Sequence, residues 1–177
     1  MLIREARAVD AAGLAKVTVD SWKTTYASIV PAEFLASLSY KKNTPVWRTR
    51  LSDSASTWSY YVAEDDKAKI IGFVGGGTER NGNSVYTAEL GFIYLLQTYQ
   101  RKGIGRQLTA TLANRLIQQG HHSMMVWTFA ANPNRLFYEA LKAKLIGERN
   151  VNIGGANLVE VSYSWEDLHT LQIDKLV

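Results

Sequence analysis

Cysteine is absent from all 177 residues of the chain. This absence excludes disulfide bonds, cysteine-based zinc sites and a thiol nucleophile. Histidine is scarce, and the three that occur, His121, His122 and His169, lack the spacing of metal ligands. No apolar run reaches the length that spans a membrane, and the first residues carry charges where a signal peptide needs an apolar core. We therefore expect a cytoplasmic protein with no metal and no membrane partner.

The chain also lacks a large excess of either positive or negative charge. The net charge is +4 and the isoelectric point is near 9.3. A basic protein can bind nucleic acid, but these basic residues are scattered along the chain, so we expect no nucleic-acid partner. Their densest cluster comprises Arg101, Lys102 and Arg106. A cluster of this size suits a small polyanionic ligand.

The length predicts a single domain over residues 1–177 with a sizeable core. Hydrophobic periodicity divides the chain into helical and extended stretches. The expected helices cover residues 9–20, 21–29, 31–38, 44–51, 103–119 and 132–142. The expected strands cover residues 2–7, 58–63, 69–74, 85–96, 123–129, 145–153 and 158–165, and the tail 166–177 is expected as a short amphipathic end or an interface element. These elements predict a mixed α+β fold.

Residues 92–108 carry the strongest functional signal. A β-type apolar run is followed by a short basic turn with two glycines and then by an amphipathic helix. This order points free backbone N–H groups and a positive helix end at one place, which is an anion site, usually for phosphate. The P-loop string is absent, and the Rossmann string lacks its third glycine after Gly103 and Gly105. A third pattern, [Q/R]-x-x-G-x-[G/A], is matched in full from Gln100 to Gly105.

This third pattern resembles the acetyl-CoA motif of the GCN5-related N-acetyltransferase family, usually called GNAT. A second stretch, N-P-N-R-L-F-Y-E at residues 132–139, is similar to the family's later N-P-A-R-x-F-Y-E stretch. The similarity covers nearly the whole chain. Departures occur at Asn134, where alanine is usual, and at Lys142-Ala143, where a glycine pair is usual. The resemblance implies a mostly antiparallel, twisted central sheet of about seven strands flanked by helices, with acetyl-CoA as the co-substrate.

The resemblance also implies which residues hold acetyl-CoA. They lie at the end of the strand, in the basic turn and in the later stretch: Ile93, Tyr94, Leu95, Gln100, Arg101, Lys102, Gly103, Ile104, Gly105, Arg106, Asn132 and Tyr138. In the family the asparagine contacts the pantetheine arm and the tyrosine protonates the leaving thiolate. The plainer interpretations are a helix N-cap for Asn132, with Pro133 as the first helical residue, and a core aromatic for Tyr138.

Two residues are candidate catalysts, Tyr138 as the acid and Glu89 as the base. Many family members carry an acid at the position of Glu89. Strand alternation places it on one face with Gly91 and Ile93, where we expect open space for an amine or a bridging water. The plainer interpretation of Glu89 is an edge carboxylate in a salt bridge.

Trp22 and Tyr26 are four residues apart on one expected helix face. They are candidates for the acceptor pocket, because the first helices shape the acceptor side in the family. Core packing explains two aromatic residues on one helix face equally well.

The sequence therefore predicts an acetyl-CoA-dependent N-acetyltransferase that acts on a primary amine of a small molecule or a protein. The resemblance implies direct transfer in a ternary complex, without an acyl-enzyme. The alternative is a non-catalytic acetyl-CoA or CoA-binding regulatory module on the same fold. Antibiotics, polyamines, amino acids, peptide N-termini and lysines all stay open as acceptors. Exposed hairpin edges and the tail are compatible with a homodimer.

Overall fold

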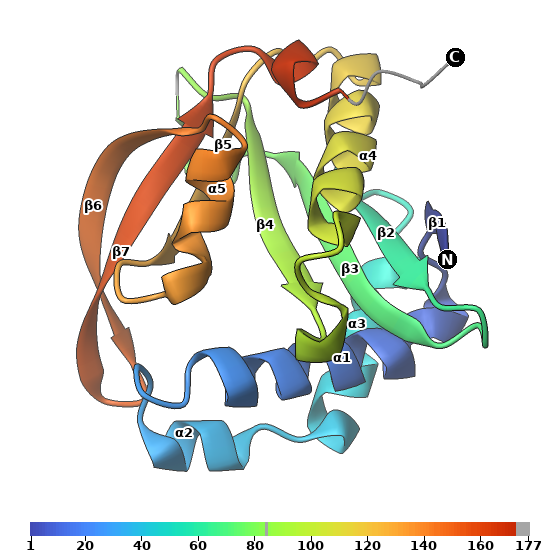
Figure 1. Cartoon of the computed structure of the whole chain (residues 1–177), viewed down its shortest axis with the longest axis vertical. Helices are drawn as coiled ribbons and strands as arrows, with labels where there is room; N and C mark the ends of the chain where they lie inside the picture. The colour runs from blue at the N-terminus through green and yellow to red at the C-terminus, as the bar shows by residue number, and fades with distance from the viewer. Residues whose placement is uncertain (84, 173–177) are drawn as a thin grey trace.

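The computed structural model describes residues 1–83 and 85–172. Its centre is a seven-stranded sheet in the order β1-β2-β3-β4-β5-β7-β6 (Figure 1). The strands are β1 (Leu2–Glu5), β2 (Ser59–Glu64), β3 (Ile70–Thr78), β4 (Ala88–Leu95), β5 (Met124–Phe129), β6 (Lys144–Ile153) and β7 (Ala156–Trp165). The α-helices are α1 (Ala11–Thr25), α2 (Ala32–Ser37), α3 (Tyr40–Ser52), α4 (Ile104–Gln118) and α5 (Leu136–Ala140). Short 3₁₀ turns cover Ala8–Asp10, Gln97–Tyr99, Pro133–Arg135 and Leu168–Leu171.

All neighbouring strands pair antiparallel except β4 and β5, which pair parallel. The parallel pair requires a crossover, and α4 supplies it between the two strands. The mixed α+β class and the mostly antiparallel sheet of seven strands that the sequence predicts are therefore confirmed.

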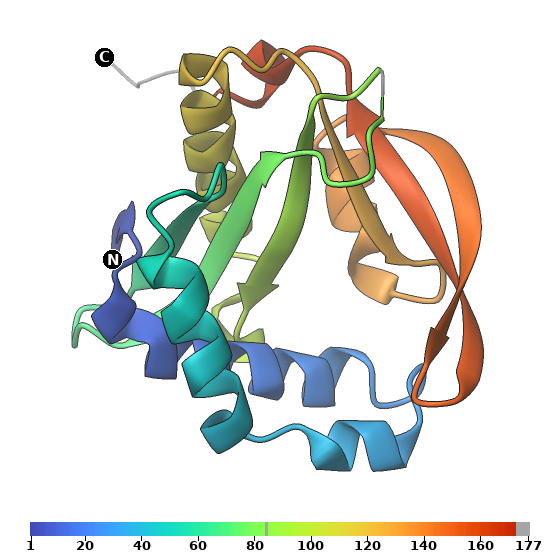
Figure 2. The same ribbon diagram turned by 180° about the vertical axis from the view of Figure 1, so that it is seen from behind.

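Helices cover both faces of the sheet (Figures 1 and 2). On one face, the leucine stripe of α4, Leu108, Leu112 and Leu116, is fully buried in the larger hydrophobic cluster. On the other face, Leu14 of α1 and Trp47 of α3 are buried in a second cluster. Each helix buries one apolar stripe, which is the arrangement that a 3.6-residue period predicts. Among the described residues, no helix combines the length and the apolarity needed to cross a membrane.

Several element boundaries differ from those expected. The two helices predicted over 9–29 are one helix, α1, because no glycine or proline interrupts the chain between Val19 and Trp22. Similarly, α3 is longer than predicted and contains Pro45 in its first half. The predicted end of the second meander strand at residue 74 is wrong, since β3 continues through three glycines to Thr78. In the tail, Leu168 and Leu171 are buried in the larger cluster, while residues 173–177 lie outside the described residues.

The departure from the family pattern at Lys142 has a backbone consequence. Lys142 follows α5 with a φ of +63°, in the left-handed region that favours glycine. A glycine pair would adopt this conformation without strain, so the sequence departure falls at the helix end, as the resemblance indicated.

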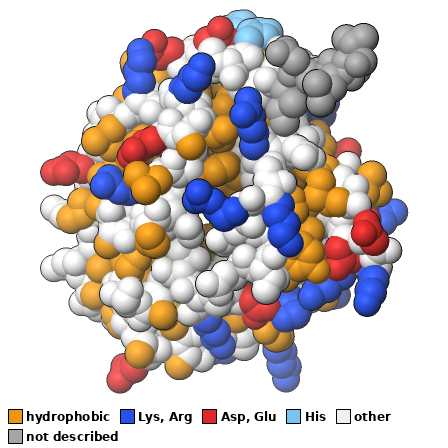
Figure 3. Space-filling view, viewed as in Figure 1, with side chains coloured by type: hydrophobic (Ala, Val, Ile, Leu, Met, Phe, Trp, Pro, Cys, Tyr) orange, Lys and Arg blue, Asp and Glu red, His pale blue; other side chains and the backbone are white. Residues whose placement is uncertain are grey.

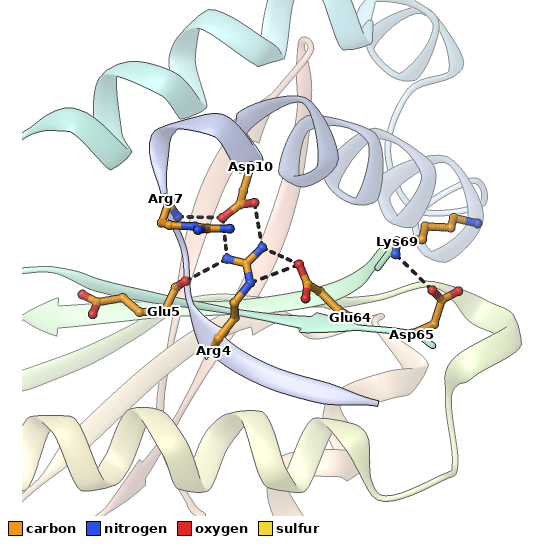
Figure 4. A network of polar contacts seen from close by, with 7 residues as sticks. All are labelled: Arg4, Glu5, Arg7, Asp10, Glu64, Asp65 and Lys69. Atoms are coloured by element: carbon orange, nitrogen blue, oxygen red, sulfur yellow. Dashed lines mark hydrogen bonds and ion pairs between the residues drawn. The ribbon is translucent and has the colours of Figure 1, made fainter. Parts of the chain in front are cut away.

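Arg4 joins three elements near the N-terminus (Figure 4). Its guanidinium donates to both carboxylate oxygens of Asp10 at 2.7 and 2.8 Å, and to Glu64 at the end of β2 through Nε at 3.0 Å and through Nη2. The Asp10 carboxylate also accepts from the backbone N–H of Arg7 at 2.7 Å. These bonds fix the chain between β1 and α1. The hydrogen bond from Arg4 is the main reason that the pKa of Asp10 is lowered.

We expect the Asp10→Asn variant to lose about 1 to 2 kcal/mol of unfolding free energy at pH 7, because it removes a charge-assisted pair. The pKa of Asp10 is lower in the folded state than its ordinary value of 3.8. Its contribution is therefore complete above that value and is lost as the pH falls through the lower folded value. Urea unfolding at pH 7 and pH 3 checks this. The wild type should lose more stability on acidification than the variant, and the exposed Glu33→Gln control should behave as the wild type.

Candidate functional site

The site begins where β4 and β5 separate. The two strands pair only at Ala88 with Met124 and at Glu89 with Met125, and then diverge (Figure 1). A β-bulge in β4 lies at this point: Gly75 of β3 faces Phe92 and Gly76 faces Leu90, so Gly91 is the extra residue. The bulge bends β4 away from β5. The main-chain groups of β4 beyond Glu89 therefore lack a strand partner on the β5 side.

Alternation along β4 decides which main-chain groups face this gap. The N–H of Leu96 donates to Ile71 at 2.9 Å, so the main chain of Leu96 and of Tyr94 points toward β3. Ile93 and Leu95 consequently present their N–H and C=O groups to the gap. Two of the three strand positions that the resemblance named thus have main-chain groups on the open side, and Tyr94 has its main chain on the other.

The basic turn closes one end of the gap. The side chain of Gln100 donates from Nε2 to the carbonyl of Leu95 at 3.0 Å, which holds the turn against the end of β4. Arg101 and Gly103 have φ values of +62° and +79°, and Gly103 is the N-cap of α4. Alternating left-handed residues turn successive N–H groups toward one side.

The N–H groups of residues 101–106 make no hydrogen bond with any described residue, and the next backbone donor is Gln107, which bonds Gly103 at 3.1 Å. Six successive free donors at a positive helix end can bind an anion. The side chains of Arg101, Lys102 and Arg106 are exposed around it. Figure 3 shows basic side chains near the middle of the face that carries α4. The predicted phosphate-binding turn therefore has suitable geometry.

Asn132 follows β5 on the opposite side of the gap. Its side-chain oxygen accepts from the N–H of Asn134 at 2.9 Å, and its Nδ2 donates to Thr128 Oγ1 at 3.0 Å. The expected N-cap role is therefore confirmed, with Pro133 as the first residue of the turn. One amide hydrogen stays free to donate to a ligand.

Tyr138 lies on α5 and is 7% exposed. Its ring packs against Tyr163 at 5.7 Å and Trp165 at 6.2 Å between centroids. The expected core packing is therefore present. Its hydroxyl bonds no described residue, and burial is the main cause that raises its pKa above the ordinary value of 10.0. The group thus keeps its proton over the neutral range and is available as a hydrogen-bond donor.

The structure changes the expected surroundings of Glu89. The carboxylate is buried, and both oxygens accept from Arg80, at 3.0 Å from Nε and 2.6 Å from Nη2. The Arg80 guanidinium stacks on the ring of Trp58 at 4.5 Å. The expected salt bridge is confirmed, but the expected edge position is wrong, because Glu89 is buried on a central strand. The prediction of open space beside Gly91 is wrong. The ring of Trp58 fills this space, since a Cβ on Gly91 would lie 2.3 Å from it.

The predicted shared face of Glu89, Gly91 and Ile93 holds for Glu89 and Gly91, which both face Arg80 and Trp58, and is wrong for Ile93. The bulge at Gly91 adds one residue, so every side chain beyond it moves to the opposite face of the sheet. Phe92 and Tyr94 pack with the cluster below α1 and α3, while Leu90 and Ile93 pack with the α4 cluster.

Trp22 and Tyr26 contact each other edge-to-face at 4.9 Å, as their spacing predicts. Tyr26 also packs against Phe129 at the end of β5, at 5.3 Å. Trp22 donates from Nε1 to the hydroxyl of Tyr94 at 2.9 Å. These aromatic residues line the side of the gap opposite α4.

No sequence pattern predicts the side-chain contacts of two residues in this site, Arg80 and Tyr94. Arg80 lies in a polar loop, and nothing in its spacing marks Glu89 as a partner nine residues away. The hydroxyl of Tyr94 meets Trp22 from 72 residues along the chain. The resemblance names Tyr94 only as a residue that holds acetyl-CoA. Among the described residues, no group of three or more acidic or histidine side chains could hold a metal ion.

With strands β4 and β5 separating beside the start of α4, the chain has the fold of acetyltransferases. The fold of an N-acetyltransferase from Staphylococcus aureus Mu50 matches with a TM-score of 0.74 at 20% identity, over 94% of this chain and 98% of that one. PaiA N-acetyltransferase from Thermoplasma acidophilum, solved with coenzyme A, matches with a TM-score of 0.67 at 23% identity, over 93% and 98%.

The sequence itself gives the family. The model of the "Acetyltransferase (GNAT) family" matches residues 21–142. The uncharacterized N-acetyltransferase YuaI of Bacillus subtilis (strain 168) is 41% identical over 170 residues, which are 96% of this chain and 95% of that protein. The chain belongs to the GNAT acetyltransferase family. This confirms the resemblance seen in the sequence and the expected class of enzyme, an N-acetyltransferase.

Proposed function

We propose that this enzyme transfers the acetyl group of acetyl-CoA to a primary amine by direct transfer in a ternary complex. One observation carries the proposal: six successive free N–H groups lie at one end of the gap between β4 and β5. Two fold neighbours were solved with such ligands, PaiA with coenzyme A and YncA of Salmonella typhimurium with acetyl-CoA.

The residues at the gap fit the parts of acetyl-CoA. Residues 101–106 offer free donors and basic side chains that suit a pyrophosphate. The open N–H and C=O of Ile93 and the N–H of Leu95 suit the amides of the pantetheine arm, which would pair with them as an added strand does. The free amide hydrogen of Asn132 suits the same arm. When bound, acetyl-CoA supplies an acetyl group activated as a thioester.

In the proposed reaction, two residues move protons. Glu89 takes one proton from the attacking amine through a water molecule, using a lone pair that Arg80 leaves free. The nitrogen–carbon bond forms as the carbon–sulfur bond breaks, and Tyr138 donates its proton or a hydrogen bond to the departing sulfur. The gap-facing N–H groups of β4 stabilise the charge that develops on the thioester oxygen.

The bidentate pair of Arg80 and Glu89 favours one alternative, a non-catalytic module that binds acetyl-CoA or CoA. A module without chemistry would retain such a buried bidentate pair for stability alone. The homodimer, and the cytoplasmic location that the lack of cysteine indicates, stay predictions.

The deciding experiment combines binding and turnover. Calorimetry with acetyl-CoA measures binding to the gap, and a panel of amines with detection of released thiol measures transfer. Micromolar binding with amine-dependent thiol release supports the proposal. Binding with no release over a wide panel of amines supports the module.

Glu89→Gln separates the base from the structural pair. We expect kcat to fall by about 10²-fold or more, and the loss of rate at low pH to disappear from the profile, because a glutamine accepts no proton. The matched variant is Arg80→Gln, which breaks the same ion pair but keeps the carboxylate. It should retain the shape of the pH profile. Equal losses of stability and of rate in both variants, with unchanged profiles, would contradict the role of Glu89 as base.

A further inference from the structure

A second hollow lies on the opposite side of β4 from α4. It is a pocket of about 190 Å³ between α1, α2, α3 and β4. This volume is below the roughly 300 Å³ at which pockets for drug-sized ligands begin, so its occupant is small. Figure 2 shows these helices and the strand from this side. The pocket is lined by Thr18, Trp22, Phe34, Leu38, Asn43, Val46, Trp47, Arg50, Phe92 and Tyr94.

The lining is aromatic with a single charge. Five of these side chains are aromatic, and Arg50 is the one charged residue among them. Its guanidinium stacks 5.1 Å from the centroid of Trp47 and 5.0 Å from that of Phe92. It forms no ion pair with a described residue, and no carboxylate lines the pocket. Such a lining repels a polycation and offers a bidentate partner to a carboxylate.

The pocket reaches the transfer site through Tyr94. This side chain lines the pocket, and its hydroxyl accepts from Trp22. Phe92 and Tyr94 flank Ile93, whose main chain faces the gap. An amine beside Tyr94 would therefore lie one residue along β4 from the main chain that faces the gap, where the thioester is proposed to bind.

The strand also sets the length of the occupant. Arg50 stacks over Phe92, and Tyr94 lies two residues further along β4, about 7 Å away. A ligand that reaches both ends thus needs an apolar spacer of about one ring between its amine and its anionic group.

We propose that the acceptor is a small primary amine that carries a carboxylate across one ring or a short apolar chain, with Arg50 as the group that binds the carboxylate. This rests on the proposed acetyl transfer and narrows its acceptor. It places polyamines and long basic peptides outside the specificity of the enzyme, because no lining carboxylate compensates their charge.

Three probes that share an amine test this: 4-(aminomethyl)benzoate, its neutral amide, and benzylamine, with spermidine as the polycation. We expect kcat/KM for the benzoate to exceed that for the amide by about tenfold or more. Arg50→Gln should lower kcat/KM for the benzoate by about tenfold and change the amide by less than threefold. The control is Arg48→Gln, an exposed arginine on the same helix outside the pocket, which should keep the preference.

The outcomes separate this inference from the proposed function. Transfer to spermidine or benzylamine in preference to the benzoate overturns the inference and leaves acetyl transfer intact. If acetyl-CoA binds but no amine is acetylated, the proposed function fails. Quenching of the fluorescence of Trp22 and Trp47 then tests whether the benzoate binds in the pocket. Quenching by the benzoate at tenfold lower concentration than by the amide, lost in Arg50→Gln, supports the site; equal quenching by both overturns it.

Discussion

Gly105→Asp should weaken acetyl-CoA binding by about 100-fold, or about 2.8 kcal/mol. Gly105 is the second residue of α4, and its N–H is the fifth of the six free N–H groups of residues 101–106. A carboxylate there occupies the anion site and repels a pyrophosphate at close range. A negative charge in the first turn of a helix is favourable for the helix itself, so the variant is expected to fold.

Gly105→Asn is the matched control. Both side chains have the same size, and both place a Cβ at 3.2 Å from the ring of Phe137, so any steric cost is shared. We expect the asparagine variant to lose about tenfold or less in affinity and the aspartate variant to lose about tenfold more. Calorimetry at constant ionic strength measures both, and thermal unfolding checks that both are folded. Equal losses in the two variants would show that space, not charge, explains the effect.

The anion-binding turn could be predicted from the sequence because its geometry is local. Gly103 needs a positive φ, Gln100 reaches back only five residues to Leu95, and helical periodicity sets the start of α4. The left-handed conformation of Arg101 could not be predicted in the same way, since that residue type rarely adopts it.

A single residue, Gly91, explains why the surroundings predicted for Glu89 differ from those in the structure. Strict alternation fails at Gly91, and a glycine within a strand is itself a signal for a bulge. The glycine run of β3 was a second signal: a Cβ on Gly76 would lie 2.5 Å from the carbonyl of Glu89, so the two strands approach closely there. Both signals were local, and together they indicated that the face of Phe92 and Tyr94 would change.

The aromatic side of the site could not be predicted because its contacts are long-range. Trp22 and Tyr26 were expected near the acceptor from their place on an early helix. Their partners Tyr94 and Phe129 come from β4 and β5, and only the folded sheet brings these strands to the helix. Likewise, the position of Arg50 in the pocket depends on its stacking against Phe92, which lies on another element.

Tyr138→Phe should lower kcat by about 10²-fold or more while it changes the affinity for acetyl-CoA by less than threefold. The hydroxyl bonds no described residue, so its loss removes no internal hydrogen bond, and the ring packing on Tyr163 and Trp165 is retained. We therefore expect little change in thermal stability. The rate falls because the departing thiolate loses its hydrogen-bond donor.

The raised pKa of Tyr138 gives this prediction a second measurement. Burial keeps the hydroxyl protonated to a higher pH than the ordinary value of 10.0 allows. A donor with a raised pKa is active below that pH and is lost only above it, so the wild-type rate should show no alkaline decline up to about pH 10 from this group. Tyr163→Phe is the matched control. The hydroxyl of Tyr163 donates to the carboxylate of Glu139 at 2.7 Å and has no part in the proposed transfer. That variant should lose stability and keep kcat. A Tyr138→Phe enzyme with full kcat would leave the hydroxyl with no part in the reaction, and Tyr138 would then be a packing residue alone.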